Sequence, residues 1–140
     1  MMSKLIVAAL AALLLAGGPA LALEPLSGVQ IKQMLSDRTF QVRYQGGSTY
    51  LIYFSPAGKV KGLLAQEGFI TKVVKTGSWD IREQDALCVK YIRRSTTHRR
   101  LKMKCGKIVP QGNNVFNRYD EQGKLHAIFT FVGQGNRVPE

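Results

Sequence analysis

The chain has 140 residues, of which 20 are Lys or Arg and 9 are Asp or Glu, so its formal net charge is +11 at pH 7. This length accommodates one domain with a modest core but not two. The charge favours polyanionic partners such as acidic lipid headgroups, lipopolysaccharide phosphates, nucleic acid or an acidic protein, although a high charge also serves solubility alone.

The N-terminal segment has the three parts of a secretory signal peptide. A basic start ends at Lys4, an unbroken apolar run covers Leu5–Leu15, and Ala20-Leu21-Ala22 matches an A-x-A cleavage site. The apolar run is shorter than the ~20 residues that a membrane-spanning helix needs. We therefore expect residues 1–22 to be cleaved, no transmembrane segment, and a protein that is periplasmic or, alternatively, fully secreted.

The first predicted element after the leader is a short helix over Gly28–Leu35. Ser27 and Gln30 form a capping-box pattern at its start. A helix of this length depends on packing against a larger element. The stripe that it would bury consists of Leu26, Ile31, Met34 and Leu35.

A β-hairpin is predicted directly after this helix. Thr39–Tyr44 alternates between apolar and polar residues, Gly46-Gly47 is typical of a two-residue turn, and Thr49–Phe54 forms the return strand. In that register Val42 faces Leu51. The opposite side then presents a second apolar face that needs a cover, either the helix or a second copy of the chain in a homodimer. This face consists of Tyr50, Ile52 and Phe54.

Short strands separated by turn signals continue to the end of the chain. They are predicted over Val60–Ala65, Phe69–Lys75, Ser78–Arg82, Ala86–Arg94, Arg99–Cys105, Val115–Tyr119 and Leu125–Val132. Thr76-Gly77 is expected to break the pattern and Pro110–Asn114 to form a polar loop. We expect a mainly β domain over residues 23–132, an antiparallel meander of about eight or nine strands forming a small barrel or strongly curled sheet. Residues 133–140 are predicted to be a loose tail.

Cys88 and Cys105 are the two cysteines of the chain. Export to an oxidising compartment favours a disulfide between them over two unpaired thiols. A tight turn centred on Thr96-Thr97 places them directly opposite each other, at a Cα separation that a disulfide accepts. Because Ile92 and Leu101 share their side of this hairpin, we expect the cysteine face to point into the core.

The tip of the same hairpin is the candidate functional surface. Arginine guanidinium groups present paired donors that suit phosphates and carboxylates, and a histidine strengthens anion binding at acidic pH. A solvated hairpin that only resists aggregation is the alternative. The candidate anion-binding residues are Arg93, Arg94, His98, Arg99, Arg100, Lys102 and Lys104.

Trp79 is the only tryptophan, and it follows Gly77 near the start of a predicted strand. Because tryptophan is highly buried on average, we expect it to be a structural plug at one end of the barrel. A stacking platform for a ligand is the alternative.

The chain carries no arrangement that is typical of an active site. His98 and His126 lie in neither H-x-x-x-H nor H-x-E, no serine lies in a nucleophile elbow, and turn chemistry explains the acidic pairs. We therefore expect a protein that is not an enzyme, with no catalytic residue, no metal site and no cofactor.

Several short motifs together resemble a family of small exported proteobacterial proteins of uncharacterised function. They are Y-F-S-P-A-G-K-V-K-G at Tyr53–Gly62, G-S-W-D-I at Gly77–Ile81, L-C-V-K-Y at Leu87–Tyr91, a later K-C-G, and a D-E-Q-G-K-L turn. The resemblance implies a small periplasmic β-domain and supplies no catalytic residues. G-x-W in a strand meander is also similar to lipocalin-like barrels, whose interiors hold apolar ligands.

The expected function is that of a non-enzymatic periplasmic binding protein. Its basic hairpin would engage an anionic lipid, lipopolysaccharide or an acidic protein, and its charge also permits nucleic acid. One alternative is a carrier of a small apolar ligand in a lipocalin-like interior. The other is a periplasmic inhibitor or envelope-stress protein.

Overall fold

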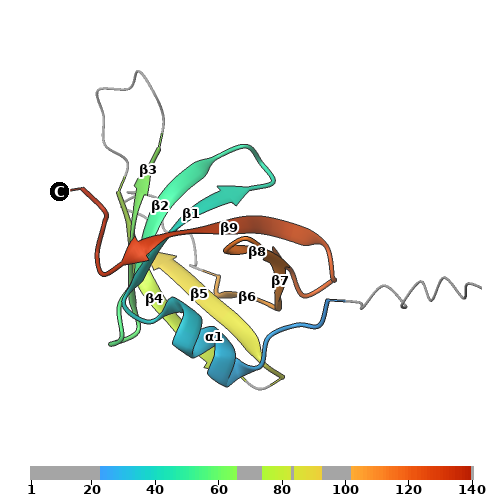
Figure 1. Ribbon diagram of the computed structural model, residues 1–140. Coiled ribbons are helices and arrows are strands. Elements are labelled where there is room, and N and C mark those ends of the chain that lie inside the picture. The colour runs from blue at the N-terminus through green and yellow to red at the C-terminus, as the bar shows by residue number, and fades with distance from the viewer. Residues whose placement is uncertain (1–22, 66–73, 83, 93–101, 140) are drawn as a thin grey trace, which may run out of the picture.

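The computed structural model describes residues 23–65, 74–82, 84–92 and 102–139, and it shows one antiparallel sheet nearly closed into a barrel (Figure 1). The strand order is β6-β5-β4-β3-β2-β1-β9-β8-β7. The predicted mainly β meander with one short N-terminal helix is therefore confirmed. The elements are α1 (Gly28–Leu35), β1 (Arg38–Tyr44), β2 (Thr49–Phe54), β3 (Lys59–Leu64), β4 (Val74–Arg82), β5 (Ala86–Ile92), β6 (Lys104–Gly106), β7 (Ile108–Gly112), β8 (Val115–Tyr119) and β9 (Leu125–Gln134).

The two strands at the ends of this order, β6 and β7, are separated in the chain by one residue, Lys107. β6 pairs with β5 on one side of the barrel, and β7 pairs with β8 on the other. At the corner between them a Cβ atom on Gly106 would overlap the carbonyl oxygen of Tyr119, and the Tyr119 N–H donates to the Lys107 carbonyl at 2.9 Å. A single bent stretch of chain thus joins the two edges of the sheet.

The helix covers one end of the barrel, which we name the helix end (Figure 1). The capping box is formed, because Ser27 Oγ accepts the Gln30 N–H at 3.2 Å and Gln30 Oε1 accepts the Ser27 N–H at 2.8 Å. Ile31 and Leu35 are fully buried where α1 packs against β1, β4 and β5. Among the described residues, no helix combines the length and the apolar character that crossing a membrane requires.

Aromatic side chains fill the interior near the helix end. The rings of Phe40, Phe54 and Phe129 have centroids 6.0 to 6.1 Å apart, and all three are at most 1% exposed. Trp79 packs edge-on against Phe54 at 5.9 Å, and its indole N–H donates to the Ser55 carbonyl at 2.9 Å. Trp79 therefore lies in the core beneath the turn between β2 and β3, with its one polar group satisfied.

The hairpin between β1 and β2 has a different turn from the predicted one. The Tyr44 N–H donates to the Ser48 carbonyl at 2.8 Å, which leaves three loop residues rather than two. Gly47 takes a positive φ of 96°, a conformation that glycine adopts readily in a three-residue hairpin loop. The extra loop residue shifts the pairing of the two strands by one position.

Because of this shift, side chains that were predicted to lie on opposite faces of the sheet lie on the same face. Val42 pairs with Tyr50 and Phe40 with Ile52, so these residues and Phe54 all face the interior. Each is at most 6% exposed. The surface predicted as a homodimer contact, Tyr50, Ile52 and Phe54, is in fact part of the core. It shares that core with Ile31 and Leu35 of α1.

Two further strand predictions are corrected. β4 continues through Thr76-Gly77 without a break. The glycine allows β5 to approach closely, since a Cβ atom on Gly77 would overlap the Lys90 carbonyl. β7 occupies part of the segment predicted as a polar loop from Pro110. Residues 69–73 of the strand predicted from Phe69 lie outside the described residues.

The segment after Gly133, predicted to be loose, is held against the start of β1. The Thr39 hydroxyl donates to the Gly135 carbonyl at 2.7 Å and accepts the Arg137 N–H at 2.9 Å. Thr39 is fully buried and Val138 is 6% exposed. The tail up to Val138 is therefore part of the packed domain.

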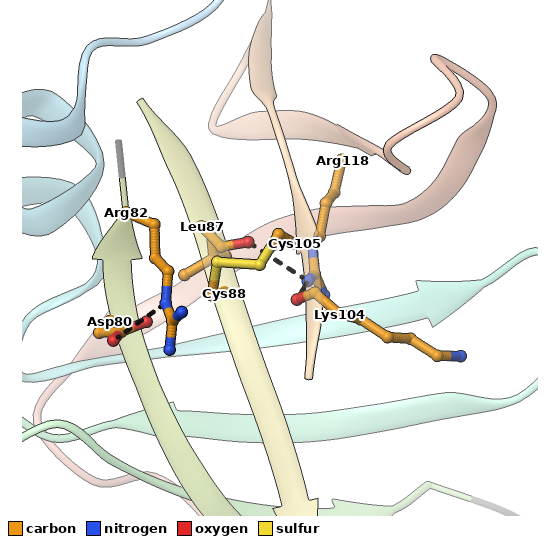
Figure 2. Close-up of a disulfide and its surroundings, with 7 residues drawn as sticks. All are labelled: Asp80, Arg82, Leu87, Cys88, Lys104, Cys105 and Arg118. Carbon is orange, nitrogen blue, oxygen red and sulfur yellow. Dashed lines mark hydrogen bonds and ion pairs between the residues drawn. A yellow bond between two sulfur atoms is a disulfide. The ribbon is translucent and has the colours of Figure 1, made fainter. Parts of the chain in front are cut away.

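A disulfide joins Cys88 in β5 to Cys105 in β6, and the register places the two residues directly opposite each other (Figure 2). The predicted cross-strand disulfide is confirmed. The predicted face is wrong, because Leu87 and Val89, on either side of Cys88, belong to the core. Since side chains alternate along a strand, Cys88 points to the outer face, where it is nevertheless fully buried. Lys104 pairs with Val89 at an inward position, but it lies near the edge of the barrel and is exposed.

We expect Gly106→Ala to lower the free energy of unfolding by about 3 kcal/mol, because the new methyl group meets a fixed backbone carbonyl. Urea denaturation of the two proteins measures the difference. Gly46→Ala is the matched control, since a Cβ atom there meets nothing within 4 Å. Equal midpoints for Gly106→Ala and the wild type would show that the corner is not tightly packed.

Replacing both cysteines by alanine should lower the free energy of unfolding by about 3 kcal/mol, as expected for a bridge across a sequence separation of 17. Urea denaturation with and without a reductant tests this. The reductant should destabilise the wild type and leave the double variant unchanged. A reductant effect of the same size on both proteins would contradict the assignment.

Candidate anion-binding site

Two of the seven basic residues predicted to bind anions are described, and both are exposed. Lys102 lies just before β6, and Lys104 is the first residue of β6. The other five lie outside the described residues, namely Arg93, Arg94, His98, Arg99 and Arg100. The site is therefore built from Lys102, Lys104 and the side chains that the fold brings to them.

These two lysines line a groove of about 420 Å³ between β6 and the turn that joins β8 to β9. It lies at the distal end of the barrel, opposite the helix end, and we name it the basic groove. Its ionisable lining residues are Lys102, Lys104, Arg118, Tyr119, Asp120, Glu121 and His126. The groove thus joins the predicted lysines to ionisable residues of β8, β9 and the turn between them.

Arg118 is the buried cation of the basic groove, and only 2% of it is exposed. Its Nη2 donates to the Lys104 carbonyl at 2.7 Å and, more weakly, to the Leu87 carbonyl at 3.5 Å (Figure 2). These bonds link β8 to β5 and β6, which belong to the other edge of the sheet. Within the described residues, Arg118 Nε has no hydrogen-bond partner.

The tyrosines near Arg118 do not supply a negative charge. The hydroxyl groups of Tyr44 and Tyr91 lie 3.1 Å apart. Burial raises the pKa of Tyr44 and raises the pKa of Tyr91 well above its ordinary value, so both phenols are neutral at pH 7. Burial lowers the pKa of Arg118, but a guanidinium group stays charged at neutral pH. In the part of the chain that the structure describes, no carboxylate forms an ion pair with Arg118.

A second cation faces the interior at the distal end. Lys75 Nζ lies 4.0 Å from the ring centroid of Tyr50, 5.2 Å from that of Tyr91 and 5.4 Å from that of Tyr44. Such distances allow cation–π attraction to all three rings. The distal part of the interior is therefore cationic and aromatic, in contrast to the apolar helix end.

His126 reports the electrostatic potential of the basic groove. Burial lowers its pKa most, and the positive charges of Arg118 and Lys104 lower it further, while Asp120 acts in the opposite direction. Two nearby cations outweigh one carboxylate, so His126 is neutral at pH 7. Its ring also packs edge-on against Tyr44 at 5.4 Å.

The acidic residues of the groove lie on its turn side. Asp120 Oδ1 accepts N–H groups from Gln122 and Lys124, each at 2.9 Å, and so holds the turn between β8 and β9. Glu121 is exposed. Within the described residues, no three His, Cys, Asp or Glu side chains gather closely enough to hold a metal ion. The groove thus carries positive charge on its inner wall and negative charge on its turn side.

The sequence prediction missed Arg118 and Lys75, although a signal for both was present. Arg118 follows Phe116 by two positions, and Lys75 precedes Gly77 and Trp79 by two and four positions. Side chains two residues apart in a strand share a face. A cation on the face that carries the aromatic core residues is the pattern that identifies both.

Comparison of the chain with protein-family models, with curated proteins and with solved structures finds no match. The likeness to lipocalin-like barrels holds for shape alone, a small antiparallel barrel that is nearly closed. The resemblance to a family of small exported proteins stays a prediction.

We expect His126 to titrate below its ordinary pKa of 6.5, and Lys104→Met to raise that pKa because it removes one of the two cations. The unfolded chain then binds its proton at higher pH than the folded protein, so His126 should favour unfolding as the pH falls below 6.5. Proton NMR of the imidazole ring in both proteins measures the pKa. Lys32→Met is the control, and an unchanged pKa in Lys104→Met would refute the positive field.

Proposed function

We propose that the protein is a non-enzymatic periplasmic binding protein whose basic surface around β6 engages an anionic lipid or lipopolysaccharide of the cell envelope. The observation that carries this proposal is the basic groove. It combines the exposed Lys102 and Lys104 with the buried Arg118, whose charge no described carboxylate neutralises. Buried charges ordinarily have partners, so a site of this kind favours an anion from outside the chain.

The other charges of the chain also favour an anionic partner. The chain has 20 basic and 9 acidic residues, and one ion pair joins two described residues, Arg82 Nε and Asp80 Oδ2 at 3.6 Å. Both side chains of this pair are more than half exposed, so the pair contributes little. The excess of basic over acidic residues would accelerate encounter with a negative surface.

The surface around the basic groove is large enough for more than a small ion. A second groove of about 640 Å³ lies beside the disulfide, on the outer face of the barrel. Cys105, Tyr119, Asp120 and Glu121 line both grooves. Two adjoining grooves favour a ligand with several groups, such as a lipid headgroup region, over an isolated ion.

An apolar carrier is the less favoured function. The rings of Phe40, Phe54 and Phe129 occupy the apolar part of the interior. The distal part carries Lys75 and Arg118, which suit an apolar ligand poorly. The described side chains thus favour binding of an anion at the distal end over storage of an apolar molecule inside.

Binding of the processed protein to vesicles tests the proposal. We expect binding to vesicles that contain phosphatidylglycerol or lipopolysaccharide, none to phosphatidylcholine vesicles, and steep loss of binding with added salt. Lys102→Ser combined with Lys104→Ser should weaken binding about 10- to 30-fold, since each lysine near an anionic surface contributes about 1 kcal/mol.

Lys32→Ser combined with Lys59→Ser is the matched control, because it removes two exposed charges from the helix end. If both double variants weakened binding equally, binding would depend on net charge alone, which would contradict a site at β6. Absence of binding by the wild type would refute the proposed function. Serine at Arg93, Arg94, Arg99 and Arg100 extends the test to the arginines that the sequence predicts.

A further inference from the structure

We infer that the inner wall of the basic groove is a binding site for a phosphate monoester, with Arg118, Lys104 and His126 as its donors. The inference rests on the proposed function and adds to it the chemical group that is recognised and the residues that recognise it. It concerns side chains that are all described, from β6, β8 and β9.

Arg118 supplies the fixed part of this site. Its Nη2 is engaged with two backbone carbonyls, so the guanidinium group is held in one position. Its Nε is buried and has no partner in the described part of the chain. A buried donor without a partner is rare in folded proteins and ordinarily indicates a missing ligand or water. Because Arg118 also lines the groove, its guanidinium charge acts on an anion bound there, and a small shift of the side chain would bring this donor to the anion.

Lys104 supplies the adjustable part. The Lys104 carbonyl accepts a hydrogen bond from Arg118 at 2.7 Å, so the Lys104 backbone is fixed next to the Arg118 guanidinium group. The Lys104 side chain is exposed and lines the same groove, and its ammonium group has room to approach a bound anion. A rigid fork beside a flexible ammonium group is a combination that suits phosphate.

His126 completes the donor set on the β9 side. The charged groups that act on it come from each neighbouring element: Arg118 from β8, Lys104 from β6 and Asp120 from the turn, while the neutral Tyr44 of β1 packs on its ring. A bound dianion would offset the two cations and make protonation of His126 easier. The imidazolium group would then add a third charge-assisted donor.

A phosphate monoester fits this set better than a carboxylate does. It carries about 1.5 to 2 negative charges at pH 7 and three strong acceptor oxygens, whereas a carboxylate carries one charge and two oxygens. Asp120 and Glu121 on the turn side repel any anion, a phosphate included. The bound group therefore has to lie against the inner wall, next to Arg118 and Lys104 and away from the turn.

Titration of inorganic phosphate into the processed wild-type protein tests this directly, with the His126 imidazole resonances as the readout. The chain has two histidines, so a His98→Gln variant leaves a single signal to follow. We expect phosphate to raise the pKa of His126 by about 0.5 or more, and sodium chloride at equal ionic strength to leave it unchanged or nearly so. An unchanged pKa in phosphate would overturn the inference.

Variants locate the site. Lys104→Met should weaken phosphate binding about tenfold, since it removes a charge-assisted contact, while Lys32→Met should leave it unchanged. Glu121→Gln should tighten binding by removing a repulsive charge. Arg118→Lys should abolish the shift of His126 if the variant folds, and the wild-type titration decides the question if it does not. Equal affinity of Lys104→Met and the wild type would contradict the site.

Two further experiments with vesicles distinguish a lipid phosphate from a free phosphate, and the phosphate site from envelope binding. Vesicles with phosphatidic acid present a monoester, and vesicles with phosphatidylglycerol present a diester. A His126 shift with inorganic phosphate but no binding to any anionic vesicle would keep the phosphate site and refute envelope binding. Binding to both kinds of vesicle, with no His126 shift in phosphate or on phosphatidic acid, would keep envelope binding and refute the phosphate site.

Discussion

The corner between β6 and β7 is the constraint on which the barrel depends. In one bent stretch of chain, β6 pairs with β5 at one edge of the sheet and β7 pairs with β8 at the other. The bend is possible because Gly106 has no side chain that would meet the Tyr119 carbonyl. Arg118 spans the same place from inside, with hydrogen bonds to carbonyls of β5 and β6. The basic groove lies directly beside this corner, so the closure of the barrel and the candidate site share the same residues.

Arg118 is also an exception to the apolar composition of the core. Among the described residues, the other large side chains that are almost fully buried are uncharged, and apart from Thr39 they are apolar. Replacing a buried charge by a well-packed apolar residue is often neutral or stabilising, so barrel stability alone gives little reason for an arginine here. A buried cation beside neutral phenols and a neutral histidine instead makes a positive site that water screens only weakly. That property suits the binding of an anion, in addition to the hydrogen bonds by which Arg118 joins β8 to β5 and β6.

The sequence predicted those parts of the fold that short-range chemistry determines. Ser27 and Gln30 identify the start of the helix because a capping box needs only four consecutive residues, and the spacing of Cys88 and Cys105 identifies a cross-strand bridge. Pairing between β1 and β2 was wrong because β2 is apolar at nearly every position, so either register puts apolar residues inside. Only the conformation of Gly47 decides between them, and a pair of glycines permits both.

The position of β1 has a consequence for how the chain folds. β1 is bonded on one side to β2, its neighbour in sequence, and on the other to β9, with Arg38 opposite Gln134 and Tyr44 opposite Ala127. Such pairing across almost the whole domain closes a long loop, which slows folding. The first strand therefore keeps one unpaired edge until the last strand has been synthesised, and an unfinished chain on the ribosome cannot complete its barrel.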